Sequence, residues 1–283
     1  MSSIICSKPE YATAWVGSQL TMAMEGVTFS VSIHLDELVK SKSEANGLAI
    51  IVANEYSCRK DHEILTGTVN DLHAAREAFE TLKFATLPIR NASTTEIIDV
   101  VRTASRYSYP LCYKRLAFVF SGHGDGECVY ARDGKVSIQK NILNPFTPND
   151  SPSLAHIPKL FFFDACRGDA VDQGMIVTLQ TSGAVAKGSR IPSYGNYLLA
   201  YSTMPSMKAF EEPMTGGYWI QHLTKELCNE DNLDRSLGDI LTKVNGKVVT
   251  EMSQRCLNIQ QPVIETTLHQ SIYLLREARN AGM

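Results

Sequence analysis

The amino-acid sequence contains no run of 18 or more apolar residues, and its first residues lack a basic stretch followed by an apolar one. We therefore expect neither a membrane-spanning helix nor a secretory signal peptide. The formal net charge is only −3 over 283 residues, so the sequence predicts no basic surface for nucleic acid or for an anionic membrane. Internal repeats and low-complexity segments are also absent.

Paired cysteines are missing as well. The seven cysteines are an odd number, and no two of them form a Cys-x-x-Cys pair. This pattern argues against a disulfide framework and favours a reducing compartment, so we predict a cytoplasmic protein. No group of His, Cys and Asp residues has the spacing of metal ligands, and we expect neither a bound metal nor a cofactor.

Short apolar runs alternate with segments of helical periodicity from Gly47 onward. Hydrophobic residues make up 44% of the chain and charged residues 20%, as is typical of globular proteins. This alternation predicts an α/β fold in which helices cover both faces of a mostly parallel sheet. The predicted strands are Leu48–Ala53, Phe84–Ile89, Leu116–Phe120, Leu160–Phe163, Tyr197–Ser202 and Ser271–Leu275, and the predicted helices are Asn70–Lys83, Thr94–Arg106, Gly217–Leu227 and Ser236–Met252.

A cysteine and a histidine each follow one of these predicted strands. Cys166 lies in the sequence FDACRG, and His123 lies in SGHG, 43 residues upstream. Because the carboxyl ends of parallel strands meet at one edge of a sheet, we expect the two side chains to lie close together. A thiolate attacks carbonyl groups, and a nearby histidine can take its proton. The pair therefore predicts a nucleophile and its acid/base partner.

Glycines beside these residues suit the same chemistry. Gly124 allows its backbone N–H to approach a substrate closely, so the N–H groups of Gly124 and Cys166 are candidate donors for an oxyanion. The alternative is that Cys166 is a buried core cysteine, since free cysteines are often buried.

These motifs resemble those of the caspase-type cysteine proteases, and so do AYSTMP at 200–205 and LTKVNGKVVTE at 241–251. The resemblance covers residues 47–275. It implies a three-layer fold with a six-stranded, mostly parallel sheet, a Cys/His dyad, no cofactor, and protein or peptide substrates. It also implies a homodimer that pairs through the last strand, near His269–Leu275, and a role in cell death or signalling.

The resemblance changes at the specificity pocket. Caspases bind the aspartate before the scissile bond with two arginines and with a glutamine two residues before the cysteine. The matching positions here are Leu65, Glu211 and Asp164. Together with Asp71, the two acidic residues resemble the arginine-specific paracaspases, and metacaspases have similarly acidic pockets. Because carboxylates can replace the water around a guanidinium or ammonium group, we predict cleavage after arginine or lysine.

Alternatives remain for the pocket and for the function. Asp71 could instead cap its helix, Glu212 could replace Glu211, and Arg59 or Lys60 could enter the pocket if the alignment shifts. An aspartate-specific caspase with a rebuilt pocket is one alternative function. A catalytically idle scaffold or regulator is another.

The resemblance also predicts how the chain is organised. Residues 1–45 form an N-terminal extension or short prodomain, and residues 46–283 form the protease domain. Within this domain we expect a large-subunit part at 46–170, a linker at 171–193 and a small-subunit part at 194–283.

The predicted linker contains two basic residues, Lys187 and Arg190, in a stretch rich in glycine and serine. An enzyme that cuts after basic residues would cleave itself there, if it matures by self-cleavage.

Overall fold

The structure is a computed structural model that describes residues 45–57, 62–106, 113–170, 193–255 and 258–280, together with the short strands β1 (Trp15–Val16) and β2 (Gln19–Leu20). The predicted N-terminal extension and linker fall almost entirely outside the described residues. Lys187 and Arg190, the candidate cleavage sites, also lie outside them, so the domain boundaries and self-cleavage stay predictions.

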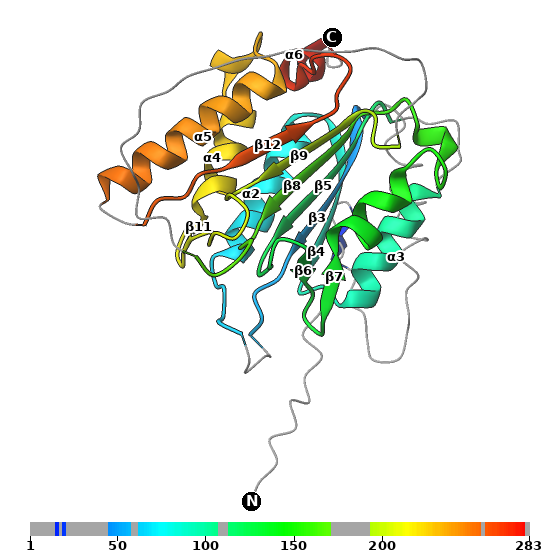
Figure 1. The fold of residues 1–283 in the computed structure, drawn as a ribbon. Helices are drawn as coiled ribbons and strands as arrows, with labels where there is room; N and C mark the ends of the chain where they lie inside the picture. The colour runs from blue at the N-terminus through cyan, green and yellow to red at the C-terminus, as the bar shows by residue number, and fades with distance from the viewer. Residues whose placement is uncertain are drawn as a thin grey trace, which may run out of the picture.

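A six-stranded sheet forms the centre of the molecule, with the order β12-β9-β8-β5-β3-β4 (Figure 1). Five strands are parallel, and the edge strand β12 runs antiparallel to β9. The central strands are buried on both faces, which explains their continuous apolar sequences. The predicted fold class is therefore confirmed. The strands are β3 (Gly47–Ala53), β4 (Phe84–Arg90), β5 (Leu116–Ser121), β8 (Lys159–Asp164), β9 (Tyr197–Tyr201) and β12 (Val263–Thr266).

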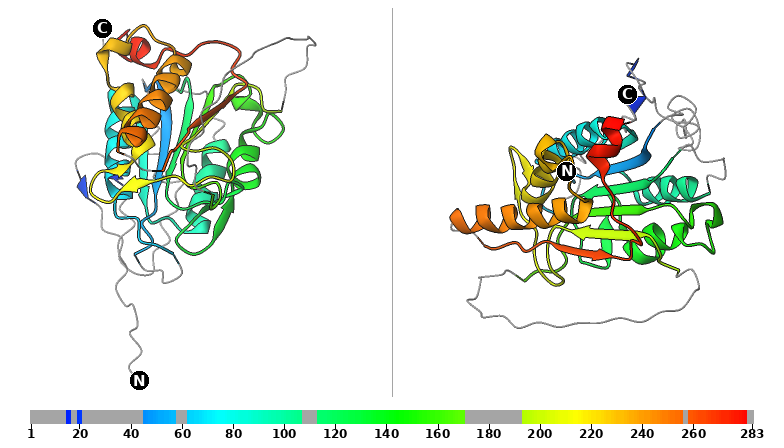
Figure 2. Two further views of the ribbon diagram at one scale, coloured as in Figure 1. Left: turned by 60° about the vertical axis from the view of Figure 1, so that its left-hand side comes forward. Right: turned by 90° about the horizontal axis from the view of Figure 1, so that it is seen from above.

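Helices cover both faces of this sheet and give the fold three layers (Figures 1 and 2). Along β3, alternate side chains belong to two separate cores: Leu48, Ile50 and Val52 pack toward α3, and Ala49 and Ile51 toward α2 and α4. The four predicted helices are present with ends shifted by up to two residues. The helices are α2 (Thr68–Thr81), α3 (Thr94–Ser105), α4 (Tyr218–Leu227), α5 (Leu237–Gln254) and α6 (Leu274–Asn280).

Shorter elements complete the fold. Two antiparallel hairpins and a run of short helical turns connect the larger elements. The hairpins are β6 (Cys128–Tyr130) with β7 (Lys135–Ser137) and β10 (Glu211–Glu212) with β11 (Gly216–Gly217), and the turns are Ile138–Leu143, Asn144–Phe146, Pro152–Leu154 and Glu230–Asn232.

The sixth strand was predicted in the wrong place. Residues 271–275 form no strand: Ile272, Leu274 and Leu275 are buried where the chain enters α6, and their apolar character serves the core. The strand is β12 instead, where Glu265 and Thr266 are exposed and no long apolar run exists. The last strand, through which a dimer was expected to pair, is therefore β12 and not a strand near His269–Leu275, and the dimer contact itself stays a prediction.

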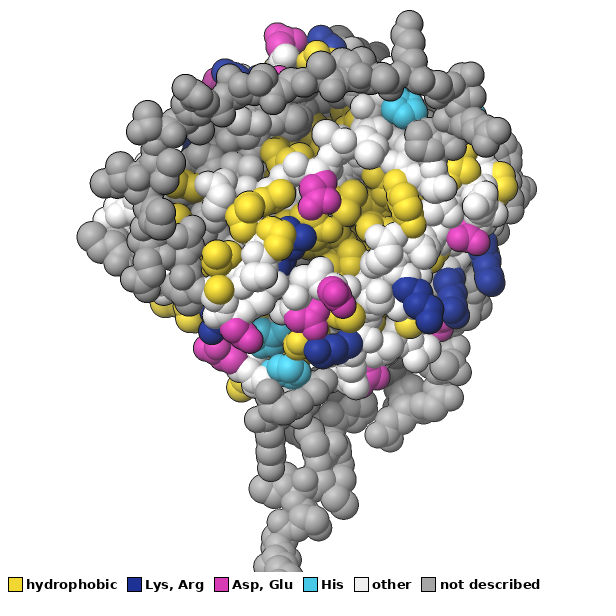
Figure 3. Space-filling model, in the orientation of Figure 1, with side chains coloured by type: hydrophobic (Ala, Val, Ile, Leu, Met, Phe, Trp, Pro, Cys, Tyr) yellow, Lys and Arg dark blue, Asp and Glu magenta, His cyan; other side chains and the backbone are white. Residues whose placement is uncertain are grey.

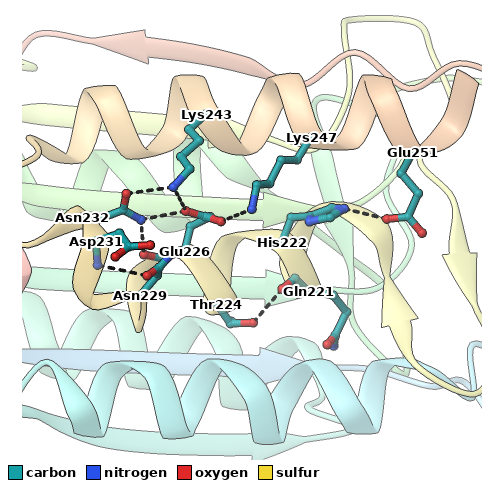
Figure 4. Close-up of polar contacts among 10 residues, drawn as sticks. All are labelled: Gln221, His222, Thr224, Glu226, Asn229, Asp231, Asn232, Lys243, Lys247 and Glu251. Carbon is teal, nitrogen blue, oxygen red and sulfur yellow. Dashed lines mark hydrogen bonds and ion pairs between the residues drawn. The ribbon is translucent and has the colours of Figure 1, made fainter. Parts of the chain in front are cut away.

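A polar network joins α4 to α5 (Figure 4). The side chain of Glu226 is 3% exposed; it accepts from Lys243 at 2.8 Å, pairs with Lys247, and accepts from Asn232 at 2.7 Å. Burial alone would raise the pKa of Glu226, but the hydrogen bonds from the two lysines lower it to about 2. The ion pairs between Glu226 of α4 and two lysines of α5 thus hold the two helices together, and they compensate for the burial of the Glu226 charge.

Lys159 carries a stability cost. It begins β8 with no exposed surface, and its Nζ has no hydrogen-bond partner among the described residues, although it lies 5.0 Å from the Tyr197 ring. Burial lowers the pKa of Lys159 to about 8, so the folded state pays for the charge below that pH. We expect Lys159→Met to raise the free energy of unfolding at pH 7 by about 2 kcal/mol.

Urea unfolding of the two proteins measures this effect. In the wild type, stability should rise as the pH increases from about 8 toward the pKa of an unfolded lysine, because only the unfolded state then binds the proton. The variant should lack that rise. Lys140→Met, at an exposed position, serves as the control with almost no change, and an equal gain in both variants would contradict the prediction.

Among the described residues, none of the helices combines the length and apolar character that crossing a lipid bilayer requires.

Candidate active site

His123 and Cys166 lie in two loops that leave adjacent strands. Ser121 ends β5 and Asp164 ends β8; the two residues are partners in the parallel register, and Gly122 N–H donates to Asp164 O at 3.0 Å. Each candidate residue, His123 or Cys166, follows two positions after the end of its strand. Both line one cavity of about 560 Å³, and Figure 3 shows histidine and charged side chains gathered in the lower part of that view, below a hydrophobic surface. The predicted meeting of the two loops at the carboxyl edge is present.

A backbone carbonyl fixes the proton on His123. The Nε2 atom lies 2.8 Å from Glu63 O. Because a carbonyl can only accept, Nε2 must carry the hydrogen, and the neutral ring keeps its lone pair on Nδ1. Burial lowers the pKa of His123, although the Glu63 carbonyl opposes this. The free site therefore holds a neutral imidazole that can act as a base at Nδ1.

The thiol of Cys166 is half-buried and protonated in the free site. Burial raises its pKa; the Ala209 N–H, which donates to Sγ at 3.4 Å, and the charge of Lys208 oppose this. A thiol with a raised pKa needs a base to become a nucleophile. The neutral His123 fits that requirement.

The N–H groups of Gly124 and Cys166 have no acceptor among the described residues. Gly124 lies opposite Val129 in an isolated antiparallel bridge. The two hydrogen bonds of this bridge run from Asp125 N–H to Cys128 O and from Tyr130 N–H to His123 O, so the Gly124 N–H is not used. A Cβ on Gly124 would lie 3.0 Å from Cys166 O, so only glycine permits this approach without a shift. Gly124 thus lies close to the backbone of Cys166, and both N–H groups are available, as an oxyanion site requires.

Five carboxylates line the same cavity, and three of them are the predicted pocket residues. Asp164 is 6% exposed, accepts from Ile220 N–H at 3.2 Å, and has its pKa raised by burial. Glu211 is half-buried; burial first, and then the charges of Asp164 and Glu63, raise its pKa to about 7. Asp71 is 1% exposed, and burial together with the charge of Asp164 raises its pKa. One wall of the cavity therefore concentrates carboxyl groups, whose burial and closeness raise their pKa values.

Asp71 lies behind the other two. Its oxygens accept from Ser121 Oγ at 2.8 Å, Gly217 N–H at 3.0 Å and Gln221 Nε2 at 2.8 Å. The helix begins at Gly67 without a side-chain cap, so the alternative of Asp71 as a helix cap is wrong. With three donors already bound, Asp71 supports the wall, and its raised pKa means that it adds little negative charge at neutral pH.

The remaining alternatives for the pocket also have an outcome. Glu211 lines the cavity, whereas Glu212 does not and lies 3.8 Å from Arg255. Leu65, at the position of a caspase arginine, lines the cavity without a charge. Arg59 and Lys60 lie outside the described residues.

Sequence reasoning missed several neighbours of the dyad. His62, Lys208 and the Glu63 carbonyl belong to loops that fold back over the cavity, and no local pattern marks them. The pair Gly216-Gly217 was a usable signal: a side chain at either position would overlap the carboxylate of Asp71 or Asp164. Within the described residues, no three His, Cys, Asp or Glu side chains are grouped to hold a metal ion.

Comparisons with known proteins identify one family. A family model described as the caspase domain matches residues 46–273. Caspase-1 of Drosophila melanogaster is 31% identical over 208 residues, which cover 72% of this chain and 64% of that protein. Caspase-3 of Mesocricetus auratus is 30% identical over 251 residues, 85% of this chain and 88% of that protein. The crystal structure of caspase-1 from Spodoptera frugiperda superposes with a TM-score of 0.70 at 26% identity, over 82% of this chain and 90% of that one.

Proposed function

The chain belongs to the caspase family and is a cysteine-type peptidase, and from this premise we propose that it is an endopeptidase that cuts after arginine or lysine. The observation that carries the specificity is the buried carboxylate of Asp164, two residues before Cys166 and on the same cavity. Cys166 is the proposed nucleophile, His123 its base, and Asp164 and Glu211 the residues that bind the basic side chain, with Asp71 behind them.

Electrostatics supports a basic substrate residue. The cavity is lined by five carboxylates and, besides two histidines, by one cation among the described residues, Lys208. A substrate aspartate placed against Asp164 and Glu211 would lose its hydration and meet like charges, a penalty of several kcal/mol. A guanidinium would instead gain two charge-assisted partners.

The proposed reaction uses the geometry of the two loops. Nδ1 of His123 takes the thiol proton as Sγ attacks the scissile carbonyl, and the N–H groups of Gly124 and Cys166 stabilise the oxyanion. The imidazolium then gives its proton to the leaving amine, which leaves an acyl group on Cys166. Water, deprotonated by His123, releases the acid and restores the thiol.

A panel of fluorogenic peptides that differ only in the residue before the scissile bond tests the proposal. Turnover should be strong with arginine or lysine and absent with aspartate, and Cys166→Ala should abolish it. Turnover with aspartate alone would favour the rebuilt caspase instead. No turnover with any peptide, and no labelling of Cys166 by an arginine-based covalent inhibitor, would favour the scaffold.

The pocket should bind cations more weakly in acid. Because the pKa of Glu211 is raised to about 7, its carboxyl is neutral below that pH and charged above it. We expect the Ki of benzamidine, a cation over this whole range, to rise about tenfold from pH 8 to pH 6. Benzamidine does not react with the thiol, so Cys166 does not contribute. Glu211→Gln should bind more weakly and lose part of the pH dependence, because Asp164 and Asp71 on the same wall also have raised pKa values; an unchanged profile in that variant would assign the titration to those groups.

Assembly is a further part of the proposal. β12 forms one edge of the sheet, and the family resemblance supports a homodimer that pairs along this edge rather than near His269–Leu275. We also propose that the enzyme cleaves itself after Lys187 or Arg190 and that it acts in the cytoplasm. Mass spectrometry of the wild type beside Cys166→Ala tests the self-cleavage, since fragments that persist in the variant would exclude it.

A further inference from the structure

The segment that follows β3 is anchored by buried polar side chains. Asn54 has no exposed surface; its Nδ2 donates to Ala92 O and Tyr130 O, both at 3.1 Å, and its Oδ1 accepts from Ala92 N–H at 2.7 Å. Glu55 forms an ion pair with Arg90 at 2.7 Å. These contacts fix the backbone immediately before Tyr56, next to the loop that carries His123.

Tyr56 is held in an uncommon conformation against that loop. Its φ of 60° lies in the left-handed region, which residues other than glycine seldom adopt, and its side chain is 1% exposed. The hydroxyl donates to Tyr130 O at 2.5 Å and accepts from His123 N–H at 2.9 Å. The ring lies beside the imidazole, with centroids 4.6 Å apart. Tyr56 thus touches both the backbone and the ring of His123.

The Tyr56 hydroxyl packs closely against Gly122, which precedes His123. A Cβ on Gly122 would lie 2.7 Å from the Tyr56 hydroxyl oxygen, so the oxygen occupies the space that a side chain would take. Tyr130 N–H in turn donates to His123 O at 2.9 Å. The hydroxyl of Tyr56 therefore links the backbone of His123 to the backbone of Tyr130, the last residue of β6.

We infer that Tyr56 is a positioning residue for the catalytic histidine, holding its backbone through the hydroxyl and its imidazole through the ring. Glu63 O has a different task, because it fixes which ring nitrogen carries the proton. The inference rests on the proposed role of His123 as the base. A base must stay within hydrogen-bond reach of the proton that it removes, so a small displacement of His123 should slow the chemical step without weakening substrate binding.

Tyr56→Phe, which keeps the ring and removes the hydroxyl, tests the inference with an arginine-ending peptide. We expect kcat to fall about tenfold with KM within twofold, since each 1.4 kcal/mol of lost transition-state stabilisation is tenfold in rate. Tyr56→Leu also removes the ring, and its kcat should be about tenfold lower again. Every kcat is expressed per active site, counted with a covalent inhibitor of Cys166, so unfolded protein does not lower the value.

Tyr197→Phe is the matched control, because Tyr197 is also 1% exposed and its hydroxyl also donates to a backbone carbonyl, Leu143 O at 3.2 Å, away from the cavity. It should lose stability and keep kcat within twofold. Equal kcat per site in Tyr56→Phe and the wild type would overturn the inference. Full activity in His123→Ala would instead overturn the proposed dyad, so the two failures are distinguishable.

A double-mutant cycle with Gly122→Ala tests the same contact from its other side, again with every rate expressed per active site. The new Cβ should displace the Tyr56 hydroxyl and slow the enzyme, and Tyr56→Phe removes that clash. The strain at the Gly122 φ of 157° and the contact with the Phe120 ring at 3.0 Å remain in both backgrounds and cancel in the cycle. We expect the double variant to be no slower per site than the slower single variant. Multiplicative losses would show that the hydroxyl does not act through this turn.

Discussion

Replacing Asp164 by asparagine should lower kcat/KM for an arginine-ending peptide by about 1,000-fold, because the variant removes the buried charge proposed to face the guanidinium. Removal of one partner from a buried charge pair costs about 2–5 kcal/mol, and 1.4 kcal/mol corresponds to a factor of ten. Asparagine has nearly the same shape and can still accept from Ile220 N–H, which Asp164 meets at 3.2 Å. The loss should therefore come from the charge and not from a collapsed pocket.

Two measurements make this result specific. The rate at which iodoacetamide alkylates Cys166 should change little, since the nucleophile and His123 remain. Asp169→Asn provides the matched control: Asp169 lines the same cavity but is exposed, so water screens its charge and the loss should stay below about threefold. If Asp164→Asn retains arginine cleavage within tenfold, the basic side chain binds elsewhere.

How well each strand can be predicted from the sequence depends on how deeply the strand is buried. The central strands are covered on both faces, so β3, β5 and β8 are written as continuous apolar runs and were predicted within one residue at each end. The edge strand β12 has an exposed half and only four residues, which leaves no run to detect. The apolar residues at 271–275 were mistaken for a strand because a short buried segment has no distinctive period.

The same distinction applies to the site. Cys166, His123 and Asp164 lie within two residues of a strand end, so their meeting follows from the parallel order of the sheet. Tyr56 and the Glu63 carbonyl reach His123 across more than 55 residues of chain. The position of Tyr56 depends on a left-handed backbone conformation, and the Glu63 contact uses a main-chain atom that any residue type has. Neither can be recognised from a sequence pattern.

His123→Ala should have the largest effect after loss of the nucleophile itself, about 10,000-fold in kcat, the scale seen when a member of a catalytic unit is removed. The pKa of the Cys166 thiol is raised by burial, so at neutral pH the variant has almost no thiolate and no base to generate it. Its residual rate should rise about tenfold per pH unit from pH 6 to 8, because hydroxide must then supply the thiolate. The wild type should be much flatter over this range.

His62→Ala is the control that isolates the base from its surroundings. The ring of His62 lies 5.3 Å from that of His123 and lines the same cavity, and it is the His123 ring that lies 2.8 Å from Glu63 O. We expect a loss below tenfold and a pH profile with the wild-type slope. A comparable loss in both variants would make the histidine pair, and not His123 alone, the acid/base group. A flat profile in His123→Ala would show that another group removes the thiol proton, since a thiol with a raised pKa cannot ionise unaided at neutral pH.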